Sequence, residues 1–188
     1  MKNILIIGKK SKQAFESLKR TNHTKINKTL NDYIKFILLN KKNIIKENKK
    51  DIKNLKRKNV LDRLILDEKK IDGIIKSIKE IKQFPNPVGK ILESWKGKNK
   101  LNIKRITTPI GVIGIIYESR PNVTADVAAL CLKSSNCAIL RGGSEAFYSN
   151  KILSNLFRKA LKKNKIDSNC LQFIENKNRK IVDYLLSK

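Results

Sequence analysis

The stretch that decides the fold is GVIGIIYESRPNVTADVAALCLKSSNCAILRGGSE, residues 111–145. Two short and continuous apolar runs, GVIGIIY and CAILR, flank a segment with helical spacing at 122–134. Apolar runs of this length are typical of strands buried on both faces of a parallel sheet, and the helix between them provides the crossover connection. The stretch therefore predicts an α/β fold.

The same alternation continues along the rest of the chain. A helix is expected over 144–163, a third strand in CLQFIE at 170–175, and a last helix over 177–187. Residues 108–188 are thus predicted to form a Rossmann-like parallel sheet that is incomplete. In the helix at 122–134, four apolar positions at helical spacing predict one buried stripe: Val123, Val127, Leu130 and Cys131.

The first 107 residues have a different pattern. Helical spacing at 10–21 and 25–57 predicts two or three amphipathic helices, and a further helical run covers 61–81 before the breaker PNPVG. Residues 1–89 are interpreted as an N-terminal helical region. Residues 90–107 alternate around the polar tip GKNK, which predicts a β-hairpin with Trp95 and Ile103 as packing partners.

The formal net charge of +27 raises the question of a nucleic-acid partner. Between residues 106 and 150 three basic and three acidic side chains cancel, so the excess charge lies elsewhere in the chain. There the lysines alternate with asparagine and isoleucine rather than with aromatic residues, which favours solvated helix faces over a polyanion-binding surface. Nucleic-acid binding by a non-enzymatic basic module remains the alternative, and a salt-sensitive duplex-binding assay discriminates between the two.

The cysteine pattern and the hydropathy narrow the class of protein. Cys131, Cys137 and Cys170 show no CxxC spacing, so we expect buried thiols and no metal site. No signal-peptide core and no segment long enough to span a bilayer is present. A cytoplasmic protein is expected.

Two loops carry the candidate functional residues, because ligands of parallel sheets bind beyond the carboxyl ends of the strands. The first loop, YESRPN, contains Tyr117, Glu118 and Arg120. In the second loop, RGGSE, two glycines allow close approach to a ligand, and Ser144 is placed to cap the following helix, whose N-terminus attracts anions. An ordinary strand-to-helix turn is the alternative. The candidate ligand-binding residues of this loop are Arg141, Gly142, Gly143 and Ser144.

Residues 109–150, PIGVIGIIYESRPNVTADVAALCLKSSNCAILRGGSEAFYSN, resemble the signature region of the γ-glutamyl phosphate reductases, a branch of the aldehyde dehydrogenase superfamily. LDRLILDEKKIDGI at 61–74 and PNPVGKILESW at 85–95 are similar to the family upstream. This resemblance implies NADPH-dependent reduction of L-glutamate 5-phosphate to the semialdehyde, in proline biosynthesis. It also implies that Asn122 donates a hydrogen bond to the oxyanion of a thioester intermediate. A helix N-cap is the alternative role for Asn122. Tyr117, Glu118 and Arg120 are expected to line the same substrate cleft as Asn122.

The resemblance also bears on the choice of cofactor. NAD-using relatives carry a lysine and, three residues later, a glutamate that binds the ribose hydroxyls, where this chain has Arg141 and Ser144. Arginine pairs with a 2′-phosphate, whereas a carboxylate would repel it, so NADPH is favoured over NADH. Glu145 is displaced by one position and is interpreted as a residue that favours the helix start.

Family members are longer than this chain, and none of its three cysteines matches their nucleophile. The catalytic domain is therefore expected to be absent, and the chain alone is expected to be inactive. A second polypeptide is one way to complete the enzyme. The hairpin at 90–107 resembles the oligomerisation ribbon of the superfamily, which implies a homo-oligomer for the complete enzyme.

Overall fold

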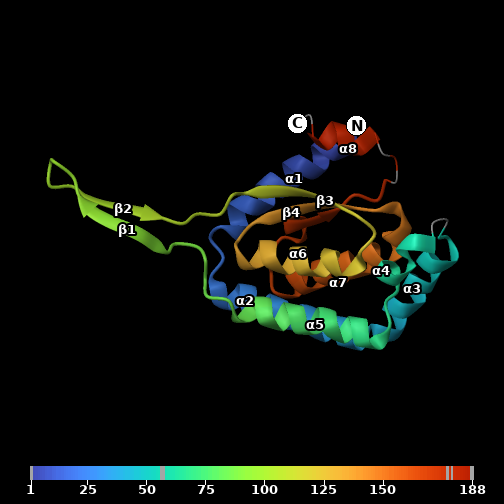
Figure 1. Ribbon diagram of the computed structural model, residues 1–188. Helices are drawn as coiled ribbons and strands as arrows, with labels where there is room; N and C mark the ends of the chain where they lie inside the picture. Colours follow the sequence, from blue (N-terminus) through green and yellow to red (C-terminus); the bar gives the residue numbers. More distant parts are fainter. Residues whose placement is uncertain (1, 56–57, 177, 179, 187–188) are drawn as a thin grey trace.

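A three-stranded parallel sheet lies at the centre of the molecule (Figure 1). The computed structural model describes residues 2–55, 58–176, 178 and 180–186. The strands follow the order β3 (Val112–Tyr117), β4 (Cys137–Gly142) and β5 (Leu171–Phe173). Every residue of the central strand β4 is buried, as its continuous apolar run predicts. The predicted α/β fold is confirmed.

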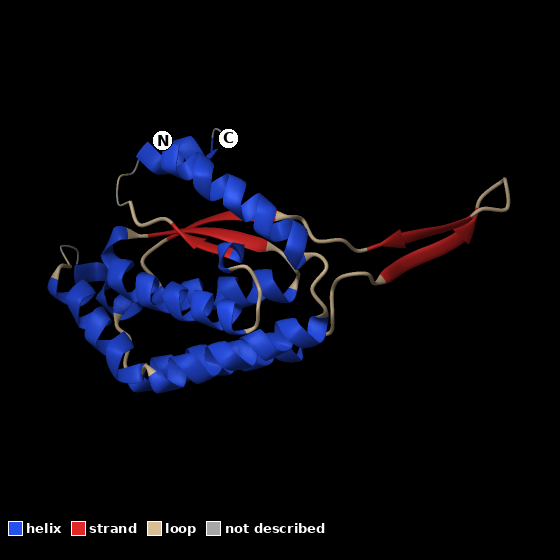
Figure 2. Cartoon of the chain, turned by 180° about the vertical axis from the view of Figure 1, so that it is seen from behind, coloured by secondary structure: helices blue, strands red, loops and turns tan. Residues whose placement is uncertain are grey.

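Helices cover both faces of this sheet (Figures 1 and 2). The connecting helices α6 (Pro121–Lys133) and α7 (Phe147–Lys163) share one face, because both right-handed crossovers advance in the same direction. Helix α1 (Lys2–Leu18) covers the other face. Helices α2 (His23–Leu39) and α5 (Glu68–Gln83) pack against α6 and α7 as a further layer. One cluster of buried apolar side chains runs through all these layers.

Two of the predicted helical runs are interrupted. Residues 56 and 57 of the run at 25–57 lie outside the described residues, and the rest of the run contains α2 and α3 (Lys41–Lys53). Asn40 separates these two helices, and its side-chain amide donates to the carbonyl of Phe36 at 2.8 Å. The run at 61–81 becomes α4 (Leu61–Leu64) and α5. Asp67 begins α5 as its N-cap, because its carboxylate accepts from the amide of Lys70 at 2.7 Å. The last helix, predicted over 177–187, is α8 and spans Lys180–Leu186, while residues 177, 179 and 187 lie outside the described residues.

The buried stripe predicted for α6 is wrong in part. Cys131 is buried, but Leu130 is 44% exposed and Val127 is only half-buried. Alanines provide the buried surface instead, because α6 lies between the sheet and α5, and small side chains let the backbones approach closely. The buried alanines are Ala125, Ala128 and Ala129.

The predicted hairpin is confirmed and extends away from the rest of the molecule (Figures 1 and 2). Strands β1 (Ile91–Lys96) and β2 (Asn102–Ile106) pair antiparallel, and Trp95 lies opposite Ile103. Every residue of both strands is exposed. A two-stranded ribbon with exposed apolar side chains is at best marginally stable by itself.

Candidate functional site

The two loops predicted from the sequence meet at one cavity of about 520 Å³. Tyr117, the last residue of β3, is paired in register with Gly142, the last residue of β4. The cavity therefore lies beyond the carboxyl ends of both strands, as parallel-sheet topology requires. We call it the first cavity. Six of the predicted site residues line it: Tyr117, Glu118, Arg141, Gly142, Gly143 and Ser144.

The two glycines of the first cavity are required by protein packing. A Cβ on Gly142 would overlap the side-chain amide of Asn150 and would approach Cζ of Tyr117 to 2.9 Å. A Cβ on Gly143 would overlap Oγ of Ser119 and would lie 2.9 Å from the backbone nitrogen of that residue. The sequence analysis explained these two glycines by close approach to a ligand, and the structure adds a second reason, which is the lack of space for a Cβ atom. The glycines let the two loops approach each other closely.

Arg141 is the buried cation of the first cavity. Only 7% of its surface is exposed, and its guanidinium donates a hydrogen bond to the carbonyl of Gly142. Burial lowers the pKa of Arg141, while the nearby carboxylate of Glu145 acts in the opposite direction. A guanidinium with little access to water attracts an anion more strongly than one on the surface.

Sequence reasoning missed the place of Glu145. Its carboxylate lines the first cavity and accepts a hydrogen bond from the hydroxyl of Ser119 at 2.7 Å. The hydroxyl of Ser144 lies 3.4 Å from the same carboxylate oxygen. Glu145 thus brings a negative charge into the cavity rather than only favouring a helix start. Ser119, in the other loop, provides the contact, and that pairing has no local sequence signal.

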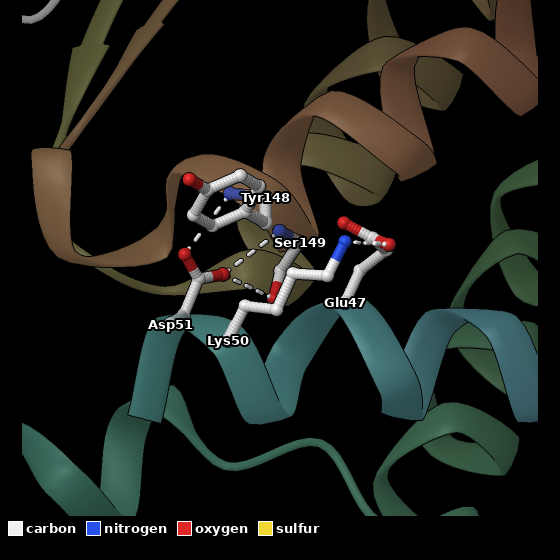
Figure 3. Close-up of polar contacts among 5 residues, drawn as sticks. All are labelled: Glu47, Lys50, Asp51, Tyr148 and Ser149. Atoms are coloured by element: carbon white, nitrogen blue, oxygen red, sulfur yellow. Dashed lines mark hydrogen bonds and ion pairs between the residues drawn. The ribbon is translucent and has the colours of Figure 1, made fainter. Parts of the chain in front are cut away.

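The predicted helix cap at Ser144 is wrong, because α7 begins three residues later and is capped from another helix (Figure 3). Asp51 of α3 accepts from the backbone amides of Tyr148 at 3.0 Å and Ser149 at 2.8 Å. It also accepts from the hydroxyl of Ser149 at 2.7 Å. Because a carboxylate already binds two of the amides at the N-terminus of α7, these two amides are not available to an anionic ligand of the RGGSE loop.

A neighbouring side chain strengthens the connection between α3 and the site. Asn48, one turn before Asp51, donates to Oγ of Ser149 at 3.0 Å and to the carbonyl of Leu64 at 2.8 Å. Its amide oxygen accepts from the backbone amide of Leu66 at 2.8 Å. Helix α3 therefore fixes α7 and the α4 to α5 connection relative to each other.

Tyr117 faces inward as well as lining the first cavity. Its hydroxyl lies 2.6 Å from Oγ1 of Thr124, and that oxygen donates to the side-chain carbonyl of Asn150 at 2.8 Å. With the Thr124 proton used in this way, Tyr117 acts as donor to Thr124. Burial raises the pKa of Tyr117 to about 12, so its hydroxyl stays protonated at neutral pH. The chain of hydrogen bonds holds β3, α6 and α7 together beneath the cavity.

Arg120 and Asn122 lie in a second cavity, of about 590 Å³, between the start of α6 and the α4 to α5 region. Asn122 is the second residue of α6, so the alternative role as an N-cap is wrong. Its side-chain amide donates to Asp126, at 3.3 Å from Oδ2. Arg63 lines both cavities and forms an ion pair with Glu118 at 3.3 Å. The predicted residues are therefore divided between two adjoining cavities.

The three cysteines are free and buried. Burial raises the pKa of Cys131 to about 11, and a hydrogen bond with Cys137 together with burial raises the pKa of Cys170. Thiols of this kind are poor nucleophiles at neutral pH. The described residues contain no group of three or more histidine, cysteine or acidic side chains that could hold a metal ion. Throughout the same residues, each helix is too short or too polar to cross a bilayer.

The chain is similar to known proteins in both sequence and structure. No protein-family model matches the chain. The chain is 43% identical over 185 residues to the gamma-glutamyl phosphate reductase of Thermoanaerobacter sp. (strain X514), covering 94% of this chain and 44% of that protein. It superimposes on the crystal structure of gamma-glutamyl phosphate reductase from Thermotoga maritima with a TM-score of 0.93 and 36% identity, covering 97% of this chain and 45% of the other.

A more distant structure shows the wider fold. The probable aldehyde dehydrogenase from Listeria monocytogenes superimposes with a TM-score of 0.74 at 11% identity, covering all of this chain and 39% of that one. The aldehyde dehydrogenase-like fold predicted from the sequence is confirmed. The chain spans less than half the length of the relatives it matches.

Proposed function

Because the chain belongs, over the part that it spans, to the gamma-glutamyl phosphate reductase family, we propose that it is part of an enzyme that reduces L-glutamate 5-phosphate to L-glutamate 5-semialdehyde. Phosphate leaves in this reaction, which is a step of proline biosynthesis. The observation that carries the proposal is the 43% identity over 185 residues to a protein of that name. The first cavity, at the carboxyl ends of β3 and β4, supports a cofactor-binding role for this part.

The proposed cofactor is NADPH, which supplies the hydride when it is bound. The first cavity fits the adenosine end of such a nucleotide, since it combines the buried guanidinium of Arg141 with the hydroxyl of Ser144. Arg141 would pair with the 2′-phosphate, and the backbone at Gly142 and Gly143 would lie against the ribose. Glu145 lies in the same cavity, so its charge opposes that of Arg141 and tunes the preference between NADPH and NADH.

Asn122 is the proposed donor to the developing oxyanion. Its side chain is exposed at the start of α6 and lines the second cavity. The hydrogen bond to Asp126 is 3.3 Å long, so the amide is readily available to a substrate oxygen. Preorganised donors of this type stabilise the charge that forms during attack on an acyl carbon. Tyr117, Glu118 and Arg120 remain proposed substrate-cleft residues.

The nucleophilic cysteine is proposed to lie outside these 188 residues. Cys131, Cys137 and Cys170 are all buried in the core, away from both cavities. A second polypeptide or a longer chain would supply the nucleophile and the remaining elements. The exposed hairpin is the proposed oligomer contact, because its apolar side chains have no cover in the described chain. Three free thiols are consistent with the cytoplasm as the proposed compartment.

The test is to restore the rest of the enzyme. This chain is joined to the part of the Thermotoga maritima enzyme that it does not cover, and NADP⁺ reduction is measured with L-glutamate 5-semialdehyde and phosphate, the stable side of the reaction. Phosphate-dependent formation of NADPH is the expected result. A well-folded fusion that forms no NADPH with this substrate, while the intact Thermotoga maritima enzyme does, would contradict the proposal.

A further inference from the structure

The second cavity has a lining of mixed charge. Three cations and two carboxylates come from α4, α5, α6 and Arg120, the residue immediately before α6. A polyanion site would carry cations alone, whereas a site of mixed sign suits a ligand that itself carries both signs. The polar residues concerned are Asp62, Arg63, Lys70, Arg120, Asn122 and Asp126.

Asp126 is the carboxylate with spare capacity to accept hydrogen bonds. Its Oδ2 accepts from Asn122 at 3.3 Å, while its Oδ1 is buried and has no hydrogen-bond partner in the described part of the chain. A buried carboxylate oxygen that lacks a donor is unfavourable, and an ammonium group would provide both the donor and the opposite charge. Rotation of the carboxylate about its broad χ2 torsion can present either oxygen to the cavity.

The cations of the second cavity are available to an anion. The side chain of Arg120 is exposed and takes part in no hydrogen bond or ion pair within residues 2–55 and 58–176. Arg63 pairs with Glu118, but the two side chains are 54% and 76% exposed, and such pairs are weak. Lys70 is already engaged, because its ammonium donates to the carbonyl of Asp62 at 2.6 Å. Arg120 and Arg63 are thus the groups suited to a carboxylate.

Part of the cavity is apolar and open. Gly73 of α5 lines it, and a Cβ at this position would have no atom within 4 Å. Ile65 and Ile74 provide apolar surface beside this gap. The cavity therefore offers a carboxylate for an ammonium group, guanidinium groups for a carboxylate, and space for methylene groups.

We propose that the second cavity binds the α-ammonium and α-carboxylate end of an amino acid, with Asp126 pairing with the ammonium and Arg120 and Arg63 with the carboxylate. The choice of L-glutamate as the amino acid rests on the function proposed above. Arg63 lines both cavities and therefore marks the boundary between them. An amino acid held in this way directs its side chain along the boundary between the second cavity and the first. Asp126 is assigned here as the residue that distinguishes an amino acid from a plain diacid.

The test compares L-glutamate with glutarate, which lacks only the amino group. Binding to the full 188-residue chain is followed by NMR chemical shifts at millimolar ligand concentrations. We expect the Asp126→Asn change to weaken the binding of L-glutamate by roughly tenfold or more, as for loss of a charge-assisted hydrogen bond. The same change should leave the affinity for glutarate unchanged or raise it. Glu80→Gln is the matched control, because it removes the same charge from an exposed position of α5 outside the cavity.

A second variant fills the space in the second cavity and leaves the charged residues of the cavity unchanged. Gly73→Leu places a side chain in the cavity and removes a glycine from a helix, so we expect binding of both ligands to be lost while the fold is retained or stabilised. Gly8→Leu is the matched control, because Gly8 lies on α1, also has no atom within 4 Å of an added Cβ, and does not line the cavity.

The outcomes separate this inference from the proposed function. Binding of L-glutamate that is unaffected by both Asp126→Asn and Gly73→Leu, or no binding at all, would overturn the amino-acid site, whether or not the fused enzyme is active. Binding that depends on Asp126 and Gly73, with a fused enzyme that does not reduce NADP⁺, would retain the amino-acid site and reject the reductase.

Discussion

Asp51 and Ser149 lie 98 positions apart, yet the carboxylate of Asp51 accepts two hydrogen bonds from Ser149, one from its backbone amide and one from its hydroxyl. Both residues are buried. The RGGSE loop, residues 141–145, lines the first cavity and ends two residues before α7 begins at Phe147. Because the contact with Asp51 holds the start of α7, it also helps to position this loop.

Loss of this cap is expected to destabilise the chain. Asp51→Ala should lower the free energy of unfolding in urea by about 2 kcal/mol, because it removes a helix cap and leaves buried donors without an acceptor. Asp51→Asn, which keeps one acceptor oxygen, should cost less. Asp72→Ala is the control, since the side chain of Asp72 is 56% exposed and forms an ion pair with Lys41 within the described residues. Equal losses for Asp51→Ala and Asp72→Ala would refute the role of the cap.

The glycines of the first cavity should not tolerate a methyl group. Gly142→Ala and Gly143→Ala are each expected to lower the free energy of unfolding by about 1–3 kcal/mol, because the added atom overlaps Asn150 or Ser119. Gly114 lies in β3, and a Cβ at this position would have no atom within 4 Å, so Gly114→Ala should change the free energy of unfolding little. Thermal unfolding of the three variants under the same conditions checks this order.

Arg141 should set the preference between the two nicotinamide cofactors. In the fused enzyme, Arg141→Glu is expected to raise the KM for NADPH by roughly tenfold or more, as for loss of a hydrogen bond between charged groups, and the KM for NADH much less. Arg20→Glu, at an exposed position of the chain outside both cavities and outside the hairpin, is the charge-matched control. If both KM values rose by the same factor, the assignment of the 2′-phosphate to Arg141 would be wrong.

His23, the single histidine of the chain, provides a test by pH. Burial and the nearby ammonium of Lys133 lower the pKa of His23 below its ordinary value. The neutral imidazole is thus favoured in the folded state, so its contribution to stability is present at neutral pH and is lost as the pH falls through the folded pKa. NMR titration of the imidazole should give this depressed pKa, and Lys133→Met should raise it, whereas Lys76→Met on the surface should not.

The cysteines should be protected from reagents while the chain is folded. Cys131 has a pKa of about 11 and all three thiols are buried, so a thiol reagent at pH 8 should react with none of them in the native state. In urea it should react with all three. Rapid native labelling at Cys137 would show that the start of β4 opens to solvent, contrary to its burial.

The sequence predicts the elements of the sheet well because their signals are local. Continuous apolar runs identify β3 and β4, and the rule for parallel sheets then places Tyr117 beside Gly142. The break before α5 was missed, although Asp67 is a favourable N-cap, because the apolar spacing continues across it. The buried alanines of α6 were missed because hydrophobic spacing weighs Val and Leu above Ala, whereas close packing between two layers selects small side chains.

The polar contacts of the site depend on tertiary structure. Asp51 and Ser149, or Ser119 and Glu145, are brought together by packing that no spacing rule contains. A serine near a helix start is the common cap, so Ser144 was assigned a role that a distant aspartate fills. The division of the predicted residues between two cavities also follows from the turn of the chain at Ser119 and Arg120, which points the end of β3 and the start of α6 toward different spaces.

The cap formed by Asp51 has a consequence for how this site can evolve. A helix N-terminus that binds an anion through backbone amides is fixed by the fold, and a single amino-acid replacement rarely removes it. Here two of those amides are already used inside the protein, so the cofactor recognition that we propose for the first cavity rests on replaceable side chains, chiefly Arg141 and Glu145. If the proposed cofactor role holds, single replacements at these positions are expected to change the preference between NADPH and NADH without any change to the scaffold.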